Sequence, residues 1–253
     1  MNAMTSPADD AVLEVQHLTK TFGALVSVND LSFGVRRGQV KSIIGPNGAG
    51  KTTLFNLIAG MLKPDRGRIM FRSRDITHLR PHQIAQRGIV RSFQIVHTLP
   101  MLTAFENIRI ALQSRTRGIQ RLIPVYARRE MELRVEQILE SVQLADRRDT
   151  LAANLSHGQQ KHLELGMTLA MEPDLMLLDE PTAGMTPSES RQTVRLIKAL
   201  GAGKTVLLVE HDMIVVEDIS DVVMVLHYGA KIAEGAPQEV LKNRDVIEAY
   251  FGG

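Results

Sequence analysis

The feature that most constrains this chain is a glycine-rich loop set between an apolar run and an amphipathic segment. Val40, Ile43 and Ile44 precede the loop, and the amphipathic residues 53–58 follow it. An apolar run, a turn of small residues and an amphipathic segment predict a buried strand, a loop and a helix, in that order. The loop itself comprises Gly45, Pro46, Asn47, Gly48, Ala49, Gly50, Lys51, Thr52 and Thr53.

The spacing within this loop is typical of a loop that cradles phosphate. Gly45 is followed after four residues by Gly50, Lys51 and Thr52. Small residues let backbone N–H groups curl around an anion, and the positive end of the following helix points at it. Lys51 would then reach the β- and γ-phosphates of a nucleotide, while the Thr52 hydroxyl would bind Mg²⁺. A glycine-rich turn without a ligand is the alternative, but the flanking strand and helix favour a nucleotide site.

Composition places the chain among soluble globular proteins. With 253 residues, 44% of them hydrophobic and 23% charged, it can bury a substantial core. The absence of cysteine excludes disulfides and thiolate metal sites and fits a reducing cytosol. Residues 1–11 lack the apolar core of a signal peptide, and no run approaches the ~20 apolar residues that span a bilayer. We therefore expect any membrane role to be peripheral.

The net charge of the chain says little about its binding partners. The net charge of +2 gives little support for nucleic acid as a partner. One stretch departs from this balance, because residues 113–129 contain five arginines and no acid: Arg115, Arg117, Arg121, Arg128 and Arg129. A solvated helix face is one interpretation, and a surface that meets anionic lipid headgroups or a membrane partner is the other.

The remaining sequence divides into regions of different periodicity. Short alternating runs at residues 13–18, 31–35 and 67–71 predict an antiparallel sheet near the glycine-rich loop. Residues 81–89 and 103–144 have helical spacing. The longer of these two segments predicts a mainly helical insert.

Three continuous apolar runs then indicate buried strands, at residues 175–178, 206–209 and 222–226. Such runs, separated by helices, are what a parallel sheet covered on both faces requires. Ser156 is suited to cap the helix before the first run. Residues 186–189 combine an N-cap threonine, a proline and a glutamate, which predicts the start of a helix between the first two runs. The whole pattern predicts an α/β fold.

Polar side chains with possible roles in chemistry follow two of these strands. Asp179 and Glu180 end the first strand at the edge of the sheet where ligands bind. Asp179 would hold Mg²⁺ through water, and Glu180 would orient and deprotonate the attacking water. His211 ends the next strand and would contact the γ-phosphate. Gln94, at the boundary of the helical insert, would contact Mg²⁺ or water through its amide. The alternative is that these polar residues end strands at the surface and have no role in chemistry.

Phe22 is a candidate for contact with the base. It precedes Gly23 in a predicted turn between two strands. Its ring could stack on a purine, and packing within the core or the hairpin is the alternative.

Taken in order, these motifs resemble those of the ATP-binding subunit of an ATP-binding cassette (ABC) transporter, over nearly the whole chain. Residues 45–53 correspond to the Walker A loop and Gln94 to the Q-loop. Residues 155–159 match the signature, residues 175–180 match Walker B with its glutamate, and His211 matches the switch histidine. The resemblance strengthens the functional interpretation of Phe22, Gln94 and His211, because it implies roles for them that the local sequence does not.

The resemblance implies a P-loop NTPase (RecA-like) core with an antiparallel β subdomain and a helical subdomain. One ABC ATPase domain would cover residues 1–253. Within it, residues 12–93 and 166–253 would form the nucleotide-binding core with the β subdomain. Residues 94–165 would form the helical subdomain with the signature.

Within the family, the chain is most similar to cassettes of branched-chain amino acid uptake systems. Gln94 followed by a long insert, residues 181–187, residues 210–213 and the ending 246–250 carry this similarity. Importers of urea or short-chain amides and exporters of lipopolysaccharide remain alternatives. The chain departs from many cassettes at three positions, with His157 in place of glycine, Thr186 in place of the D-loop aspartate and Phe22 in place of tyrosine.

The resemblance also implies partners. Cassettes work in pairs, so we expect a homodimer or a pair with a paralogous cassette. Ser156, Gly158 and Gln159 of one chain would contact the ATP that the Walker A loop of the other chain holds. An integral membrane permease would dock near Gln94, and a periplasmic or extracellular binding protein would deliver substrate. The cassette would then lie at the cytoplasmic face of the cell (inner) membrane.

Three other classes of nucleotide-binding protein are rivals. A P-loop kinase would lack both the Ser-x-Gly helix start and a glutamate in the position of Glu180. Soluble cassette proteins of DNA repair or translation usually carry two cassettes or a long coiled coil, and neither is present here. A regulatory module without turnover would not need Glu180.

Overall fold

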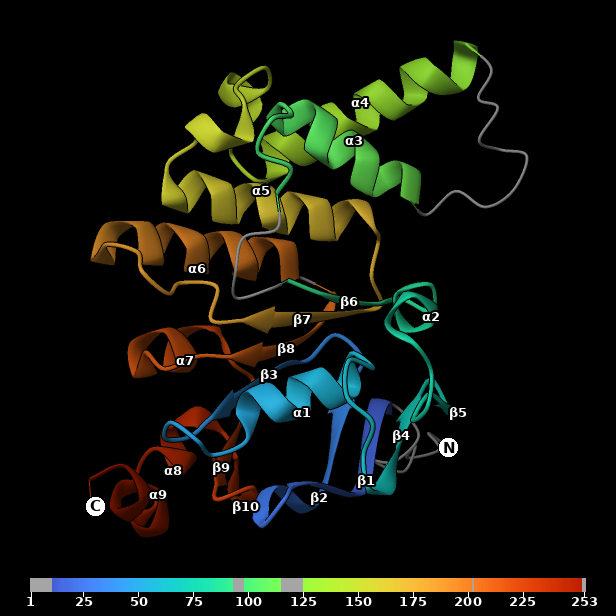
Figure 1. Cartoon of the computed structure of the whole chain (residues 1–253). Coiled ribbons are helices and arrows are strands. Elements are labelled where there is room, and N and C mark those ends of the chain that lie inside the picture. Colours follow the sequence, from blue (N-terminus) through green and yellow to red (C-terminus); the bar gives the residue numbers. More distant parts are fainter. Residues whose placement is uncertain (1–10, 93–97, 115–124, 202, 252–253) are drawn as a thin grey trace, which may run out of the picture.

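The computed structural model describes residues 11–92, 98–114, 125–201 and 203–251 (Figure 1). These residues form two sheets and the helices packed around them. Gln94 lies outside the described residues, as does most of the arginine-rich run from residue 113 to residue 129. The predictions for these two features therefore stay predictions.

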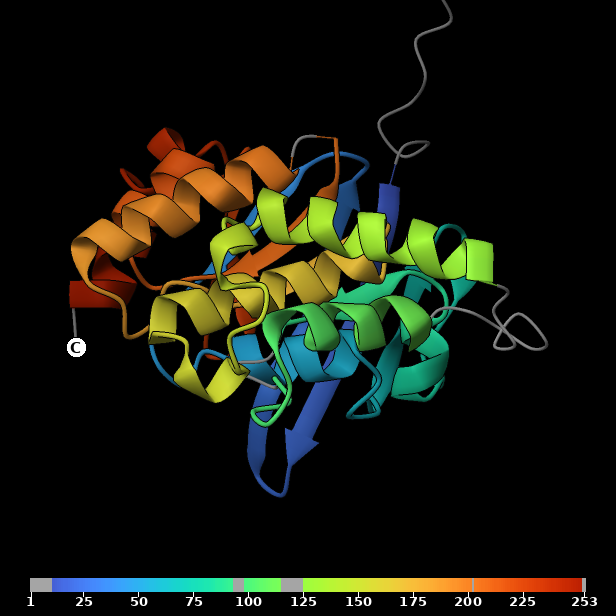
Figure 2. The same ribbon diagram turned by 90° about the horizontal axis from the view of Figure 1, so that it is seen from above.

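The first sheet is antiparallel, as the alternating runs predicted. Its strand order is β2-β1-β4-β5, with β1 (Ala11–Phe22), β2 (Leu25–Arg36), β4 (Arg66–Phe71) and β5 (Arg74–Asp75). On β1, Val15 pairs with Phe33 of β2 and with Ile69 of β4, and all three side chains are buried. Both β1 and β2 extend beyond the predicted runs into a hairpin that projects from the molecule (Figure 2). The hairpin tip is exposed, so it lacks the alternation that marks a half-buried strand.

The second sheet is the predicted parallel sheet with one antiparallel edge. Its order is β10-β9-β3-β8-β7-β6, with β3 (Val40–Ile44), β6 (Ile89–Arg91), β7 (Leu175–Asp179), β8 (Thr205–Val209), β9 (Val222–His227) and β10 (Ala230–Gly235). Only the pairing of β10 with β9 is antiparallel among the described strand pairs of this sheet. Every residue of β7 and β8 is buried, which explains their continuous apolar sequences.

Helices cover both faces of this second sheet. The helices of the described residues are α1 (Lys51–Ile58), α2 (Pro81–Ala85), α3 (Ala104–Ser114), α4 (Val125–Ser141), α5 (His157–Ala170), α6 (Pro187–Gly201), α7 (Met213–Ile219), α8 (Pro237–Val240) and α9 (Arg244–Phe251). The helical insert predicted for residues 103–144 is confirmed as α3 and α4.

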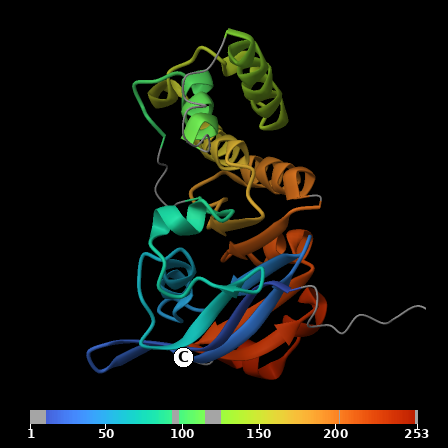
Figure 3. The same ribbon diagram turned by 90° about the vertical axis from the view of Figure 1, so that its right-hand side faces the viewer.

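The side chains of each central strand alternate between two cores. On β7, Leu175 and Leu177 belong to a core shared with α1 and the antiparallel sheet. Met176 and Leu178 belong to a second core shared with α3, α4, α5 and α6. Figure 3 shows the resulting layers, with α3 and α4 outermost, α5 and α6 beneath them, and the antiparallel sheet on the other side of the central strands. Consequently α1 and α5 pack against opposite faces of the central sheet.

The helix predicted for residues 81–89 is shorter than expected. Helix α2 ends at Ala85, Gly88 takes a φ of +102°, and Ile89 begins β6. The extension of the helix to Ile89 was therefore wrong. A three-residue strand is too short to show a period of two, and β6 is a strand because Ile89 pairs with Leu175 of β7.

Helix α5 joins the predicted helical and core regions. The boundary expected between residues 165 and 166 falls inside this helix, and its Leu163 and Leu165 share the second core with β7 and β8. No helix within the described ranges has both the length and the apolar character needed to cross a bilayer.

Candidate functional site

The glycine-rich loop between β3 and α1 is fixed at both ends by close backbone contacts. A Cβ atom at Gly45 would lie 2.1 Å from the Leu226 carbonyl oxygen, and one at Gly50 would lie 2.2 Å from the Ser27 carbonyl oxygen. Both residues also have positive φ, +151° and +102°. Glycine is therefore required at both positions, because β9 and β2 leave no room for a side chain.

The loop residues between these glycines differ in exposure. Asn47 and Gly48 are exposed and Pro46 is half-buried. Ala49 is buried, and its carbonyl oxygen accepts a 3.0 Å hydrogen bond from the Gly229 N–H. The tip of the loop is thus open to a ligand, while its base is attached to the turn between β9 and β10.

Helix α1 begins with a free N-terminus. Its N-cap is Gly50, no side chain caps it, and its first turn has no acidic residue. The first N–H groups of a helix have no partner within the helix and carry its positive dipole. Thr52 is exposed in this first turn, whereas the Thr53 hydroxyl accepts a 2.8 Å hydrogen bond from Ser27 of β2. The start of α1 is therefore suited to bind an anion.

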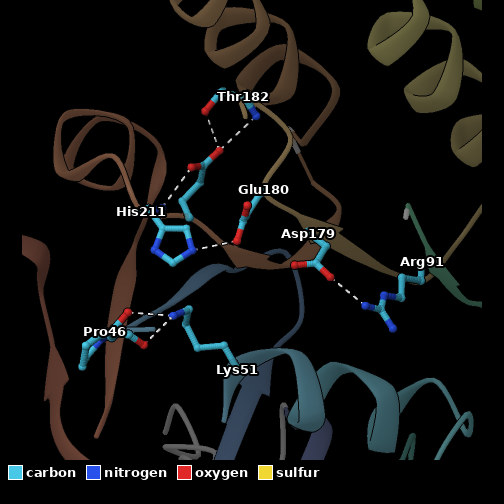
Figure 4. Close-up of polar contacts among 9 residues, drawn as sticks. Pro46, Lys51, Arg91, Asp179, Glu180, Thr182 and His211 are labelled. Carbon is cyan, nitrogen blue, oxygen red and sulfur yellow. Dashed lines mark hydrogen bonds and ion pairs between the residues drawn. The ribbon is translucent and has the colours of Figure 1, made fainter. Parts of the chain in front are cut away.

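Lys51 lies folded back over the loop. Its Nζ donates hydrogen bonds of 2.7 Å to the Gly45 carbonyl and 3.0 Å to the Pro46 carbonyl (Figure 4). Burial lowers the pKa of Lys51 below its usual value, and the charges of Glu180 and Asp179 oppose this shift. The lysine thus shares its surroundings with both carboxylates that the sequence selected.

Asp179 ends β7 and is almost wholly buried. Its Oδ2 accepts a 2.6 Å hydrogen bond from Nη2 of Arg91, which ends β6. The side chains of Asp179 and Arg91 are 1% and 8% exposed. The sequence predicted the carboxylate but not its partner, because only the pairing of β6 with β7 brings the arginine beside it.

Glu180 and His211 follow the ends of the neighbouring strands β7 and β8, and their side chains come together, a pairing that the sequence did not predict. His211 Nε2 lies 2.7 Å from Oε1 of Glu180, and the two side chains are 40% and 20% exposed. Glu180 has a φ of +48°, which turns the chain sharply away from β7. A partly exposed carboxylate, held by a histidine beside a phosphate-type loop, can act on a water molecule.

Glu210 is a buried member of the site that sequence reasoning did not single out. It accepts hydrogen bonds from the Thr182 hydroxyl at 2.6 Å, from the Thr182 N–H at 3.1 Å and from the His211 N–H at 3.1 Å. Burial raises the pKa of Glu210 above its usual value, and these hydrogen bonds oppose the shift. Glu210 ties the turn after Glu180 to the end of β8. Its position next to His211 was the only sequence signal.

The predicted N-cap at Ser156 is confirmed. Ser156 Oγ accepts a 3.3 Å hydrogen bond from the Gln159 N–H, and Gln159 Oε1 accepts a 3.0 Å bond from the Ser156 N–H. A Cβ at Gly158 would lie 3.3 Å from Oε1 of Glu189 on α6. As an acceptor in this cap, the Ser156 hydroxyl can still donate its own proton to a ligand.

Phe22 ends β1, and the residue is 46% exposed. The ammonium of Lys20 lies 5.6 Å from the ring centroid. An exposed ring beside a cation is available for stacking, but it lies at the hairpin, so its role toward a base stays a prediction.

Comparison with known families agrees with this geometry. A family model described as "ABC transporter" matches residues 28–183, which include the loop, Asp179 and Glu180. A second model, described as "Branched-chain amino acid ATP-binding cassette transporter", matches residues 230–253.

Similar curated proteins span nearly the whole chain. The high-affinity branched-chain amino acid transport ATP-binding protein LivG of Salmonella typhimurium is 39% identical over 249 residues, covering 95% of this chain and 98% of that protein. The corresponding protein BraF of Pseudomonas aeruginosa is 40% identical with the same coverage.

Solved structures share the fold. A nucleotide-free ATP-binding cassette from an ABC transporter superposes with a TM-score of 0.84 and 34% identity, covering 96% of this chain and 100% of that one. A dimeric ATP-binding cassette in a post-hydrolysis state, bound to ADP and Pi, has a TM-score of 0.77 and 26% identity, covering 89% of this chain and 98% of that one. The chain therefore belongs to the ABC transporter family and is one of its ATP-binding cassettes.

Proposed function

We propose that this chain is the ATP-hydrolysing subunit of an ABC importer for branched-chain amino acids. The observation that carries hydrolysis is the position of Glu180, which is hydrogen-bonded to His211 and lies within electrostatic range of Lys51. The substrate class is supported by the relatives, which are described as high-affinity branched-chain amino acid transport proteins and match 95% of this chain.

The arrangement supports attack of water on the γ-phosphate. Glu180 would take a proton from water as the water oxygen attacks the γ-phosphorus. The bond from that phosphorus to the bridging oxygen would break, releasing ADP and phosphate. Lys51 would exchange its two loop carbonyls for phosphate oxygens. His211 holds Glu180 until the γ-phosphate arrives and would then donate to it.

The donor groups fit a magnesium ion shared with the nucleotide. Thr52 offers an exposed hydroxyl, and one oxygen of Asp179 points away from Arg91 (Figure 4). Mg²⁺ is commonly held by one or two protein groups together with water and substrate phosphates. In that position it would neutralise charge on the β- and γ-phosphates.

A second cassette would complete the site. Lys51 and Ser156 belong to elements on opposite faces of the central sheet, so one chain holds two separate anion-binding ends. In a dimer, the Ser156 hydroxyl of one chain would donate to the ATP bound by the other. Shifting the ratio of closed to open dimers from about 1:99 to 99:1 requires roughly 5.5 kcal/mol of binding free energy that favours the closed dimer. Two shared triphosphates could supply this free energy.

An apolar pocket offers a place for the permease. It has a volume of about 280 Å³ and is lined by residues of α2, β6, β7 and the segment after α1, including Met61, Ile84, Ala85 and Leu177. A helix of a membrane partner could insert an apolar side chain there. This contact would keep the cassette at the cytoplasmic face of the membrane as a peripheral subunit.

The substitution Glu180→Gln tests the hydrolysis. We expect ATP binding to persist and turnover to fall at least about a hundredfold, because the general base is lost while the site keeps its shape. Light scattering after size-exclusion chromatography should show a dimer with Mg-ATP and a monomer with Mg-ADP. Near-normal hydrolysis by the variant would refute the assignment of the base.

The substrate needs a separate experiment. The cassette would be purified with its permease, and the associated binding protein would be screened against leucine, isoleucine, valine, urea and short-chain amides. Binding of the branched-chain amino acids is expected, whereas selective binding of urea or amides would replace the proposed substrate class.

A further inference from the structure

Arg91 connects three parts of the molecule through one buried guanidinium. Nη2 donates to Asp179 at 2.6 Å, and Nη1 donates to Oδ1 of Asn56 on α1 at 2.6 Å. The guanidinium also lies 5.7 Å from the centroid of the Phe55 ring. Arg91 thus joins the end of β6 to the end of β7 and to the helix that begins with Lys51.

Loss of either partner from the contact between Arg91 and Asp179 would be costly. Both side chains are nearly inaccessible to water, so each charge requires its partner. Figure 4 shows one Asp179 oxygen directed at Arg91 and the other directed away from it. Arg91 therefore supplies the counter-charge to Asp179 that a metal ion would otherwise supply.

Arg91 also forms part of the wall of the apolar pocket. The pocket is lined by Arg91 together with Met61, Ile84 and Ala85, and the Met61 sulfur lies 3.9 Å from Nη1 of Arg91. A side chain that fills this pocket would therefore meet the same guanidinium that holds Asp179.

We propose that Arg91 is a positioning residue that competes with Mg²⁺ for Asp179, and that filling the apolar pocket weakens its hold. The inference rests on the proposed function, in which Asp179 helps to hold Mg²⁺ and a permease segment occupies the pocket. Docking of the permease then favours metal binding at Asp179, because a group that fills the pocket beside Met61 displaces the guanidinium from the carboxylate.

The first test measures what Mg²⁺ adds to nucleotide binding. The dissociation constant of a non-hydrolysable ATP analogue is measured by calorimetry in EDTA and in Mg²⁺, and the ratio of the two constants gives the metal contribution. Arg91→Met should raise this ratio by about fivefold to tenfold, because the competing charge is gone and Asp179 needs a new partner. A purely structural role would lower the ratio or leave it unchanged, and either result would overturn the proposal.

Two further variants serve as controls for this test. Arg91→Lys keeps a cation but cannot reach Asn56 and Asp179 together, so its ratio should fall between those of Arg91→Met and the unmodified chain. Arg72→Gln removes an exposed arginine–aspartate pair of the same 2.6 Å length, with Asp174, and should leave the ratio unchanged. If the unmodified chain itself shows a ratio of one, the proposed Mg²⁺ site fails. If the unmodified chain shows a ratio above one but the Arg91 variants show no increase in it, the proposed competition between Arg91 and Mg²⁺ is refuted. The proposed Mg²⁺ site at Asp179 is then still supported.

The second test examines the link to the pocket with a double-mutant cycle. Ala85→Phe places a ring in the pocket and should raise the metal contribution in the chain with Arg91. In the Arg91→Met background the same ring should have no effect. Equal effects in the two backgrounds, or no effect in either, would show that the pocket is not coupled to Asp179 through Arg91.

Discussion

At the scale of single residues, each charged side chain of the site is held by a protein partner. Lys51 donates to two loop carbonyls, Glu180 pairs with His211, and Asp179 pairs with Arg91. A buried charge without a partner is costly, so the chain satisfies these groups with its own residues. Binding of Mg-ATP is therefore an exchange of partners, and its affinity depends on how strongly the protein contacts compete.

Lys51→Ala tests this exchange. The variant should weaken ATP binding by about 2 kcal/mol, roughly thirtyfold, because a charged hydrogen bond to phosphate is lost. Calorimetry with ATP measures the change. Lys198→Ala is the matched control, since it removes a lysine that pairs with Asp218 on the surface. An unchanged affinity in Lys51→Ala would contradict the assignment of the loop.

At the scale of elements, the two helix starts in the proposed site differ in their caps. Helix α1 begins at Gly50 without a side-chain cap, whereas α5 has a reciprocal cap between Ser156 and Gln159. The uncapped helix leaves its N–H groups for phosphate, and the capped helix is held in place before any ligand arrives.

Two substitutions at Ser156 separate capping from ligand binding. Ser156→Ala should lower the stability of the chain by about 1 kcal/mol, because the N-cap is lost. Ser156→Asp keeps the cap and should leave denaturant unfolding close to that of the unmodified chain. In the Glu180→Gln background, however, the added carboxylate should prevent the ATP-dependent dimer by repelling the triphosphate. A dimer that forms normally with Ser156→Asp would argue against contact between the signature and ATP.

The hairpin that carries Phe22 is anchored by Asp65. Its carboxylate accepts hydrogen bonds from Lys20 Nζ at 2.8 Å, the Thr21 N–H at 2.7 Å and the Thr21 hydroxyl at 2.8 Å. The hydrogen bond from Lys20, followed by those from Thr21, lowers the pKa of Asp65 from 3.8 to about 2.

This pKa predicts how the anchor depends on pH. The charged form is favoured in the folded chain, so its contribution to stability is present above pH 3.8 and is lost as the pH falls through about 2. Asp65→Asn should therefore lower the unfolding midpoint at pH 6, and its difference from the unmodified chain should shrink between pH 4 and pH 2. Urea unfolding of both chains at several pH values measures this difference in midpoint. A constant difference between pH 4 and pH 2 would contradict the anchoring role of the Asp65 carboxylate.

At the scale of the whole molecule, the central sheet separates the two anion-binding ends. The face that packs against α1 and the face that packs against α5 are built from alternate residues of the same strands. A single chain cannot bring the two ends to one phosphate without rebuilding its cores, so a shared nucleotide requires a second chain.

Mixing two inactive variants tests directly whether two chains share one nucleotide. Lys51→Ala chains lack one half of the site and Ser156→Asp chains lack the other, so neither homodimer has an intact site. An equal mixture should recover ATP hydrolysis that neither variant shows alone, because each mixed dimer has one intact site of two. A mixture no more active than its components would show that the two halves do not act on one nucleotide.

The sequence predicted most of the site because its signals are local. Gly45, Gly50, Lys51 and the strand ending in Asp179 and Glu180 each follow from spacing and hydrophobic pattern, and the capping role of Ser156 follows from residue type. Arg91 had no local signal and Glu210 had only its position next to His211, because each acquires its role from an element that is distant in the sequence.

By itself, the sequence determined the alternating runs of the first sheet, the continuous apolar strands of the second sheet, the phosphate-type loop and the carboxylates at the end of β7, since these depend on neighbouring residues and on burial patterns. Only the tertiary structure decided that β6 is a strand beside β7, that Arg91 pairs with Asp179, and that Glu210 holds Thr182. The physical reason is that pairing and burial of charges depend on which distant segments meet, and that is settled by the packing of both cores.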